Sequence, residues 1–260
     1  MKKPNSILLI SILTIAFGMT TLSFTAKVGV ALRLKPQQDQ NYTITTKSNL
    51  MTMMKVQDKT VNMSQTMETK QSFQAKKVSD SLSVIETQIE SIKITNSQQG
   101  MKFEYDSEHP EKANPIFAEF DKELKQPVTT TYDALGQLVG DSINLSLNKL
   151  NGVIIQLPEQ ELNVGSKWYY DKNHSINNTK FIINMEYTVT AISKRKVDVN
   201  VNGIIKSAEV NGTYNGTASL NPQTGLVMNS NIKENITMTI NQQGLSIPMT
   251  MVGTTTVEVN

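Results

Sequence analysis

The chain has 260 residues, a formal net charge of +2 and no cysteine. The lack of cysteine excludes disulfide bonds, thiolate metal centres and lipid attachment through a cysteine. A net charge this small, with no basic stripe, argues against a nucleic-acid partner. Charged residues make up only 18% of the chain, so its polarity comes from Asn, Gln, Thr and Ser, which suit the wet faces of β-sheets.

Residues 1–26 have the pattern of a secretory signal peptide. Lys2 and Lys3 form a basic start, Ile7–Phe17 is apolar, and small residues follow up to Ala26. The apolar stretch is shorter than the ~20 residues that a membrane span needs. We therefore expect cleavage between Ser23 and Lys27, and export to the periplasm or the extracellular space. We also expect no transmembrane span in the mature chain; an uncleaved anchor is the alternative.

The first half of the remaining chain alternates between apolar and polar residues. Tyr42–Val56 and Thr60–Ala75 each place their large apolar side chains on one parity, which is typical of strands with one wet face. A turn is expected between them near Gln57. Along Val78–Thr95 the apolar parity switches twice, which predicts a β-bulge or two bends.

The middle of the chain breaks this alternation. Asn114–Gln126 has helical apolar spacing, with Pro115 after a capping residue, and Ser142–Leu150 is a second helical candidate. Between them, Val128–Gly140 predicts a strand, a turn containing Gly136 and a short strand. Asn151–Gly165 is rich in turn residues and is the clearest internal boundary.

The last third returns to alternation. Phe181–Ala191, Val197–Val201, Leu226–Ile240 and Leu245–Val259 each hold apolar residues on one parity. Turn signals predict breaks between these segments. The pairs concerned are Asn202-Gly203, Asn211-Gly212, Asn215-Gly216 and Asn221-Pro222.

Several of these segments exceed the usual strand length of about 5 or 6 residues, and strands that long twist and coil strongly. The sequence therefore predicts a mostly β (α+β) fold with a long-stranded, strongly curved antiparallel sheet, either a half-barrel or a barrel. One or two short helices would cover its apolar face. Residues 27–260 would form a single β-rich domain; two similar halves, 27–150 and 151–260, remain open as a duplication.

Residues suited to catalysis or metal binding are few. His109 lies among Asp106, Glu108 and Glu111, which could hold a cation or could precede a helix, where acidic residues are favourable. The spacing fits no known calcium loop, and no nucleophile elbow is present. We therefore expect no enzyme activity, no catalytic residues, no metal site and no cofactor.

The thirteen methionines are the most unusual feature. Methionine adapts to irregular space and is favoured at plastic apolar binding surfaces. The sequence thus favours an exported envelope protein that binds a lipid-like ligand, a hydrophobic small molecule or a partner in a methionine-rich concave face. The alternative is a structural or interaction module of the envelope with a fully packed core. The residues expected to line the concave face are Met54, Met63, Met67, Phe73, Phe117, Phe120 and Leu124.

Several turn-and-strand motifs carry a resemblance to a known family. They are LRLKPQQDQNYTITT (32–46), FEYDS (103–107), TYDALGQLVG (131–140), LPEQELNVGSKW (157–168) and SLNPQTGLV (219–227). Together they resemble a family of unknown function comprising exported, often lipid-anchored envelope proteins of Bacteroidetes. Long antiparallel strands around one or two helices are also similar to the lipoprotein-carrier fold of periplasmic chaperones. These motifs imply a fold but no catalytic residue.

Overall fold

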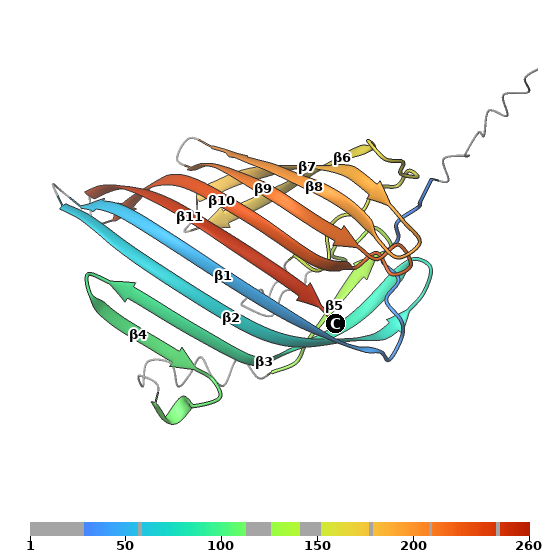
Figure 1. Ribbon diagram of the computed structural model, residues 1–260, viewed down its shortest axis with the longest axis horizontal. Helices are drawn as coiled ribbons and strands as arrows, with labels where there is room; N and C mark the ends of the chain where they lie inside the picture. The colour runs from blue at the N-terminus through green and yellow to red at the C-terminus, as the bar shows by residue number, and fades with distance from the viewer. Residues whose placement is uncertain are drawn as a thin grey trace, which may run out of the picture.

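The computed structural model describes residues 29–56, 59–112, 126–140, 152–176, 179–207, 210–242 and 245–260. These residues form one antiparallel sheet of eleven strands (Figure 1). A single turn of 3-10 helix, η1 (Pro110–Lys112), follows the fourth strand. The strands are β1 (Asn41–Val56), β2 (Lys59–Val78), β3 (Leu82–Gln98), β4 (Met101–Asp106), β5 (Val128–Asp133), β6 (Lys167–Ile176), β7 (Thr179–Ile192), β8 (Val197–Lys206), β9 (Val210–Leu220), β10 (Val227–Gln242) and β11 (Leu245–Val259).

The strand order is β4-β3-β2-β1-β11-β10-β9-β8-β7-β6, with β5 paired to β3. Strands consecutive in the chain are neighbours on each side of the centre, so the sheet consists of two meanders, β1–β4 and β6–β11. They join where β1 pairs with β11, in the register Ile44↔Val259 to Met54↔Met249. Figure 1 shows the curved, open sheet that results. The predicted mostly β, long-stranded and strongly curved antiparallel fold is confirmed, as a half-barrel rather than a closed barrel.

Alternation along each strand separates the two faces of the sheet. On β1, Tyr42 and Ile44 are buried on one face, whereas Met51 and Met53 are 64% and 47% exposed on the other. Directly paired residues share a face, so the register assigns every strand position to one side. We call the side that carries the buried core the concave face and the other side the convex face.

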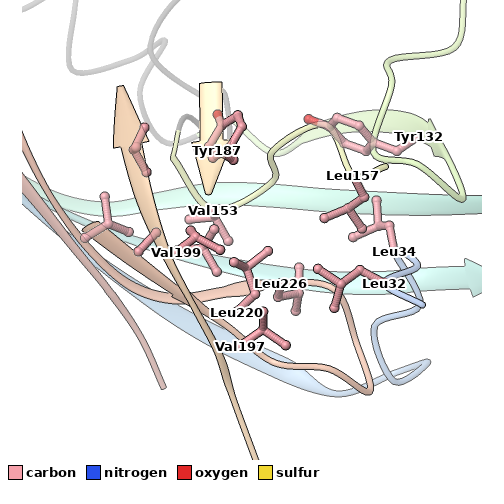
Figure 2. Close-up of a cluster of buried hydrophobic side chains, with 14 of the residues drawn as sticks. Leu32, Leu34, Tyr132, Val153, Leu157, Tyr187, Val197, Val199, Leu220 and Leu226 are labelled. Carbon is pink, nitrogen blue, oxygen red and sulfur yellow. The ribbon is translucent and has the colours of Figure 1, made fainter. Parts of the chain in front are cut away.

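One end of the concave face is filled by a continuous core, which we call the closed end. It contains residues from both margins of the sheet, including Ile85 on β3, Tyr132 on β5 and Trp168 on β6. Loop residues Leu32, Leu34, Val153, Leu157 and Leu226 pack among the strands (Figure 2). Because residues from opposite margins share this core, burying them holds the sheet in its curved shape.

Backbone hydrogen bonds fix the loops that close this end. Leu34 N–H donates to Ala134 O at 2.8 Å, Leu157 N–H donates to Leu135 O at 2.8 Å, and Val227 N–H donates to Val153 O at 2.9 Å. Trp168 stacks on Tyr187 at a centroid distance of 4.8 Å, and its indole N–H donates to Gln156 O at 2.9 Å. The loops therefore satisfy their own polar groups while their apolar side chains enter the core.

The bulge predicted within Val78–Thr95 is present. The β2–β3 register shifts between Lys70 and Gln71, so Glu90 is an extra residue on β3. This shift brings Ile89 and Ile92 to the same face, and both are buried. The other parity switch has a different cause, because Leu82 lies on the convex side and is exposed.

Turn predictions succeed in some places and fail in others. Gly136 has a φ of +79° in the turn after β5, and Asn221-Pro222 lies in the loop between β9 and β10. The three Asn-Gly turn predictions are wrong, because Gly203 lies inside β8 and both Gly212 and Gly216 lie inside β9. These glycines serve close approach of neighbouring groups: a Cβ at Gly216 would lie 2.0 Å from the Asn231 carbonyl oxygen.

The predicted helices Asn114–Gln126 and Ser142–Leu150 fall almost wholly outside the described residues, as does the signal-like segment 1–26. Within the part of the chain that the structure describes, no helix has the length and apolar character needed to span a membrane.

Candidate ligand-binding surface

Away from the closed end, apolar residues continue along the concave face without a core above many of them. Paired residues across the sheet form rows, and one row near this second end crosses five strands. We call it the methionine row. Its members are Val61, Met54, Met249, Met238 and Val210. Its three methionines are immediate cross-strand neighbours and are only partly buried. Flexible thioether side chains here form an adaptable apolar surface.

The next row towards the closed end is also mainly apolar. It consists of Met63, Thr52, Met251, Ile236, Gly212 and Ile205. Ile236, Ile205, Val210 and Phe181 form a small buried cluster, with Met238 and Met251 packed against it. The β7–β10 side of the surface is thus anchored by packing, while Met54 and Met63 on the β1–β2 side lie outside all three buried clusters.

The residues predicted to line the concave face do not all have the same surroundings in the structure. Met54, Met63 and Met67 are all on the concave face and partly buried. Met67 packs against the Ile89, Ile92 and Tyr105 cluster at one margin. The remaining three predicted residues, Phe117, Phe120 and Leu124, lie outside the described residues.

Phe73 shares the concave face but belongs to the packed closed end. It is 1% exposed, and its ring stacks on Tyr42 at a centroid distance of 4.5 Å and an interplanar angle of 6°. A side chain this enclosed is part of the core and presents no surface to a ligand. The open part of the concave face therefore begins beyond Phe73, towards the methionine row.

A pocket of about 250 Å³ lies at the rim of this open part. It is lined by Lys55 and Val56 from β1 and by Leu245, Ser246, Ile247 and Pro248 from β11. The β1–β11 pairing stops at Met54↔Met249, so the pocket occupies the space where the two strands separate. Its lining comes from both parities of the two strands, so it lies between the strand ends next to the methionine row.

A third row carries a feature that the sequence reasoning missed. Here Glu234 on β10 lies between Gly253 on β11 and Tyr214 on β9. At the described concave positions of β1 and β7–β11, Glu234 is the only charged residue. The sequence contains a signal for this feature, because Glu234 falls on the same parity as the apolar residues Ile232 and Ile236.

The carboxylate of Glu234 lies over the backbone of β11. A Cβ built on Gly253 would be 2.8 Å from Glu234 Oε1 and 3.0 Å from Leu50 Cδ1. Because Gly253 has no side chain, the Glu234 carboxylate and the Leu50 side chain can occupy the space beside it. No hydrogen bond or ion pair to the Glu234 side chain occurs within the part of the chain that the structure describes.

Burial alters the acid–base properties of Glu234 and of its cross-strand partner Tyr214. Desolvation raises the pKa of Glu234 above its usual value of 4.5. Burial, together with the nearby Glu234 carboxylate, raises the pKa of Tyr214 to about 12. Tyr214 thus keeps its hydroxyl proton at neutral pH, whereas Glu234 carries a charge that its surroundings disfavour.

This environment predicts that replacing Glu234 with Gln stabilises the protein at neutral pH. An acid with a raised folded-state pKa binds more protons when folded, so stability rises as pH falls through that pKa towards 4.5. Urea unfolding at pH 7 should give a higher midpoint for Glu234→Gln than for the unmodified protein. The difference should shrink on acidification and vanish below pH 4.5; a lower midpoint for the variant at pH 7 would contradict this assignment.

The convex face bears a smaller apolar patch. Met51 pairs with Val252, and Met53 is the next convex residue along β1; all three are exposed. Because Met53 and Met54 are adjacent in one strand yet face opposite sides, they provide a matched pair for testing which face binds a ligand.

The His109 region shows ion pairs rather than a preformed cation site. Lys93 Nζ lies 3.2 Å from Asp106 Oδ2 and 3.1 Å from Glu108 Oε2. The Glu108 backbone N–H donates to Asp106 Oδ1 at 2.9 Å, and this bond lowers the pKa of Asp106, with Lys93 also contributing. Among the described residues, no group of three or more His, Asp or Glu side chains is arranged to hold a metal ion.

Comparison with known proteins adds little to this geometry. No protein-family description matches the chain, and no curated protein matches it. One solved structure, described as lipid-protein interactions in lipovitellin, is similar at 11% identity with a TM-score of 0.40. The aligned region covers 86% of this chain and 25% of that one, so the chain spans about a quarter of that protein's length.

Proposed function

We propose that this chain is a non-enzymatic, exported protein of the cell envelope that binds a lipid-like amphipathic ligand on its concave face. The observation that carries the proposal is the methionine row, where Met54, Met249 and Met238 lie side by side and partly exposed beside a packed core. The signal-like segment 1–26 supports export.

The energetics follow from the apolar surface. Removing such surface from water contributes about 25 cal/mol per Å². Methionine side chains can adjust to differently shaped ligands at low cost. The next row towards the closed end keeps the same parity and adds the partly buried Met63 and Met251. A ligand lying along the concave face would therefore contact several strands without requiring the closed end to open.

The test uses the neutral fluorescent probe N-phenyl-1-naphthylamine and two adjacent substitutions. Met54→Glu places a carboxylate on the concave face, and Met53→Glu places the same group on the convex face. We expect the unmodified protein to bind the probe and Met54→Glu to weaken binding about tenfold or more, because the new charge must lose water under the ligand. Met53→Glu should bind within about twofold of the unmodified protein, because its charge stays in solvent.

Two results would overturn the proposal. One is no probe binding by the folded, unmodified protein, which would favour an envelope interaction module without a ligand. The other is equal weakening by the two substitutions. Circular dichroism of both variants checks that the sheet is intact, and mass spectrometry of protein purified from its native host should show a bound lipid-like molecule.

A further inference from the structure

At the described concave positions of β1 and β7–β11, a wide apolar surface surrounds one charged residue, the partly buried Glu234. Glu234 and Tyr214 are direct cross-strand partners on β10 and β9. No hydrogen bond from either side chain to another described residue is present. Both residues are partly buried, so their unpaired polar groups remain accessible to a partner from outside the chain.

We propose that Glu234 and Tyr214 form a head-group site for an amphiphile whose head is a primary ammonium group. This inference rests on the proposed function and specifies its ligand. The Glu234 carboxylate would accept hydrogen bonds from the ammonium, and the Tyr214 phenol oxygen would accept another. The apolar chain would extend over the Met251 and Met238 rows towards the rim.

Charge complementarity selects the cationic head. A bound amphiphile covers Glu234 and removes the water that now solvates it. A neutral hydroxyl head would leave the carboxylate charge uncompensated, and a carboxylate head would add repulsion, whereas an ammonium head neutralises it. Since the formal net charge of the chain is +2, the overall charge does not favour a cation, and the preference has to arise locally.

The Glu234 side chain can be reached from the concave side, because the residue is only partly buried. The space over Gly253 is taken up by this carboxylate and Leu50, and the space over Gly203 by the Met185 side chain. Tyr214 is partly buried and keeps its proton at neutral pH, so it adds no charge. Glu234 and Met238 are four residues apart on β10, about 13 Å at the usual rise of a strand. The head-group site and the methionine row therefore lie within reach of one extended alkyl chain.

The test compares heads on one chain length by displacement of N-phenyl-1-naphthylamine at pH 7. Decylamine, decanol and decanoate are titrated below the concentrations at which they form micelles. For the unmodified protein we expect decylamine to displace the probe at about tenfold lower concentration than decanoate, because the ammonium head forms a charge-assisted hydrogen bond with Glu234 whereas the decanoate carboxylate is repelled. In Glu234→Gln this preference should fall to within about threefold.

Glu258→Gln is the matched control. Glu258 is an exposed carboxylate on the convex face of β11, opposite Thr45 and Asn229. It changes the net charge by the same amount, so the preference for decylamine should persist in this variant. Dihexanoylphosphatidylethanolamine forms a further arm: displacement by it as well as by decylamine indicates a phospholipid head, and displacement by decylamine alone indicates a free amine.

The outcomes separate the two proposals. If the probe binds but decylamine and decanoate displace it equally, or if Glu234→Gln keeps the preference, the head-group assignment is overturned and the apolar surface stands. If neither the probe nor any of the alkyl compounds binds, the proposed function fails and the head-group site fails with it.

Discussion

Replacing Gly216 with Ala is expected to destabilise the protein by about 3 kcal/mol or more, at the upper end for overpacked sites. The added Cβ would lie 2.0 Å from the Asn231 carbonyl oxygen and 2.9 Å from Ile232 Cα. Both are backbone atoms of β10, so no side-chain rotation can relieve the contact. The two strands would have to separate where they exchange hydrogen bonds.

Urea unfolding measures this effect, and Thr217→Ala is the control. Thr217 is the next residue of β9 and is exposed on the convex face. Replacing it with Ala should lower the free energy of unfolding only by the difference in β-propensity between Thr and Ala, with any further change below about 0.5 kcal/mol. An unchanged midpoint for Gly216→Ala would mean that β9 and β10 are further apart than the structure shows.

The second large effect distinguishes the closed end from the open surface. Phe73→Ala is expected to cost about 3–5 kcal/mol, as for other enclosed aromatic side chains. The Phe73 ring is stacked on Tyr42 and is 1% exposed, so its removal leaves a cavity. Met63→Ala, ten residues earlier on the same strand and the same face, should cost only about 1 kcal/mol, because its side chain is already partly in water.

Ligand binding should respond in the opposite order. Met63→Ala should weaken binding of N-phenyl-1-naphthylamine, whereas Phe73→Ala, assayed at a temperature where it is folded, should leave it within about twofold, because the core lies outside the open surface. Equal unfolding costs for the two variants would show that the second end is as tightly packed as the first.

The sequence predicted the strands well because the period-two pattern is a direct consequence of having one wet face. The alternation of Tyr42–Val56 and Thr60–Ala75 correctly placed Met54 and Met63 on the concave side and Met53 on the convex side. The bulge within Val78–Thr95 was also detectable, since an extra residue inverts parity.

The failures have physical causes that lie in the tertiary structure. Asn-Gly is a strong turn signal, yet Gly212 and Gly216 lie within β9 because the backbone of β10 or its side chains approach too closely for a Cβ. Phe73 is enclosed, rather than open to a ligand, because loops far away in sequence, including Leu32 and Leu157, pack into the same core. Local patterns carry no information about such distant partners.

Glu234 illustrates a third limit. A lone glutamate in an alternating strand is easily read as a solvent-facing residue. The register sets it between Gly253 and Tyr214 and so places it on the apolar side. A search for charged residues on the apolar parity of a strand would have found it.

The central pairing of β1 with β11 has a consequence for how the protein folds during synthesis. The β1 edge leaves the ribosome well before its partner β11, which is made about 200 residues later. Until then β1 exposes an unpaired backbone edge, which other chains can join. Pairings so distant in sequence are slow to form. This strand order therefore delays completion of the sheet until β11 has been made and makes a chaperone that shields β1 advantageous.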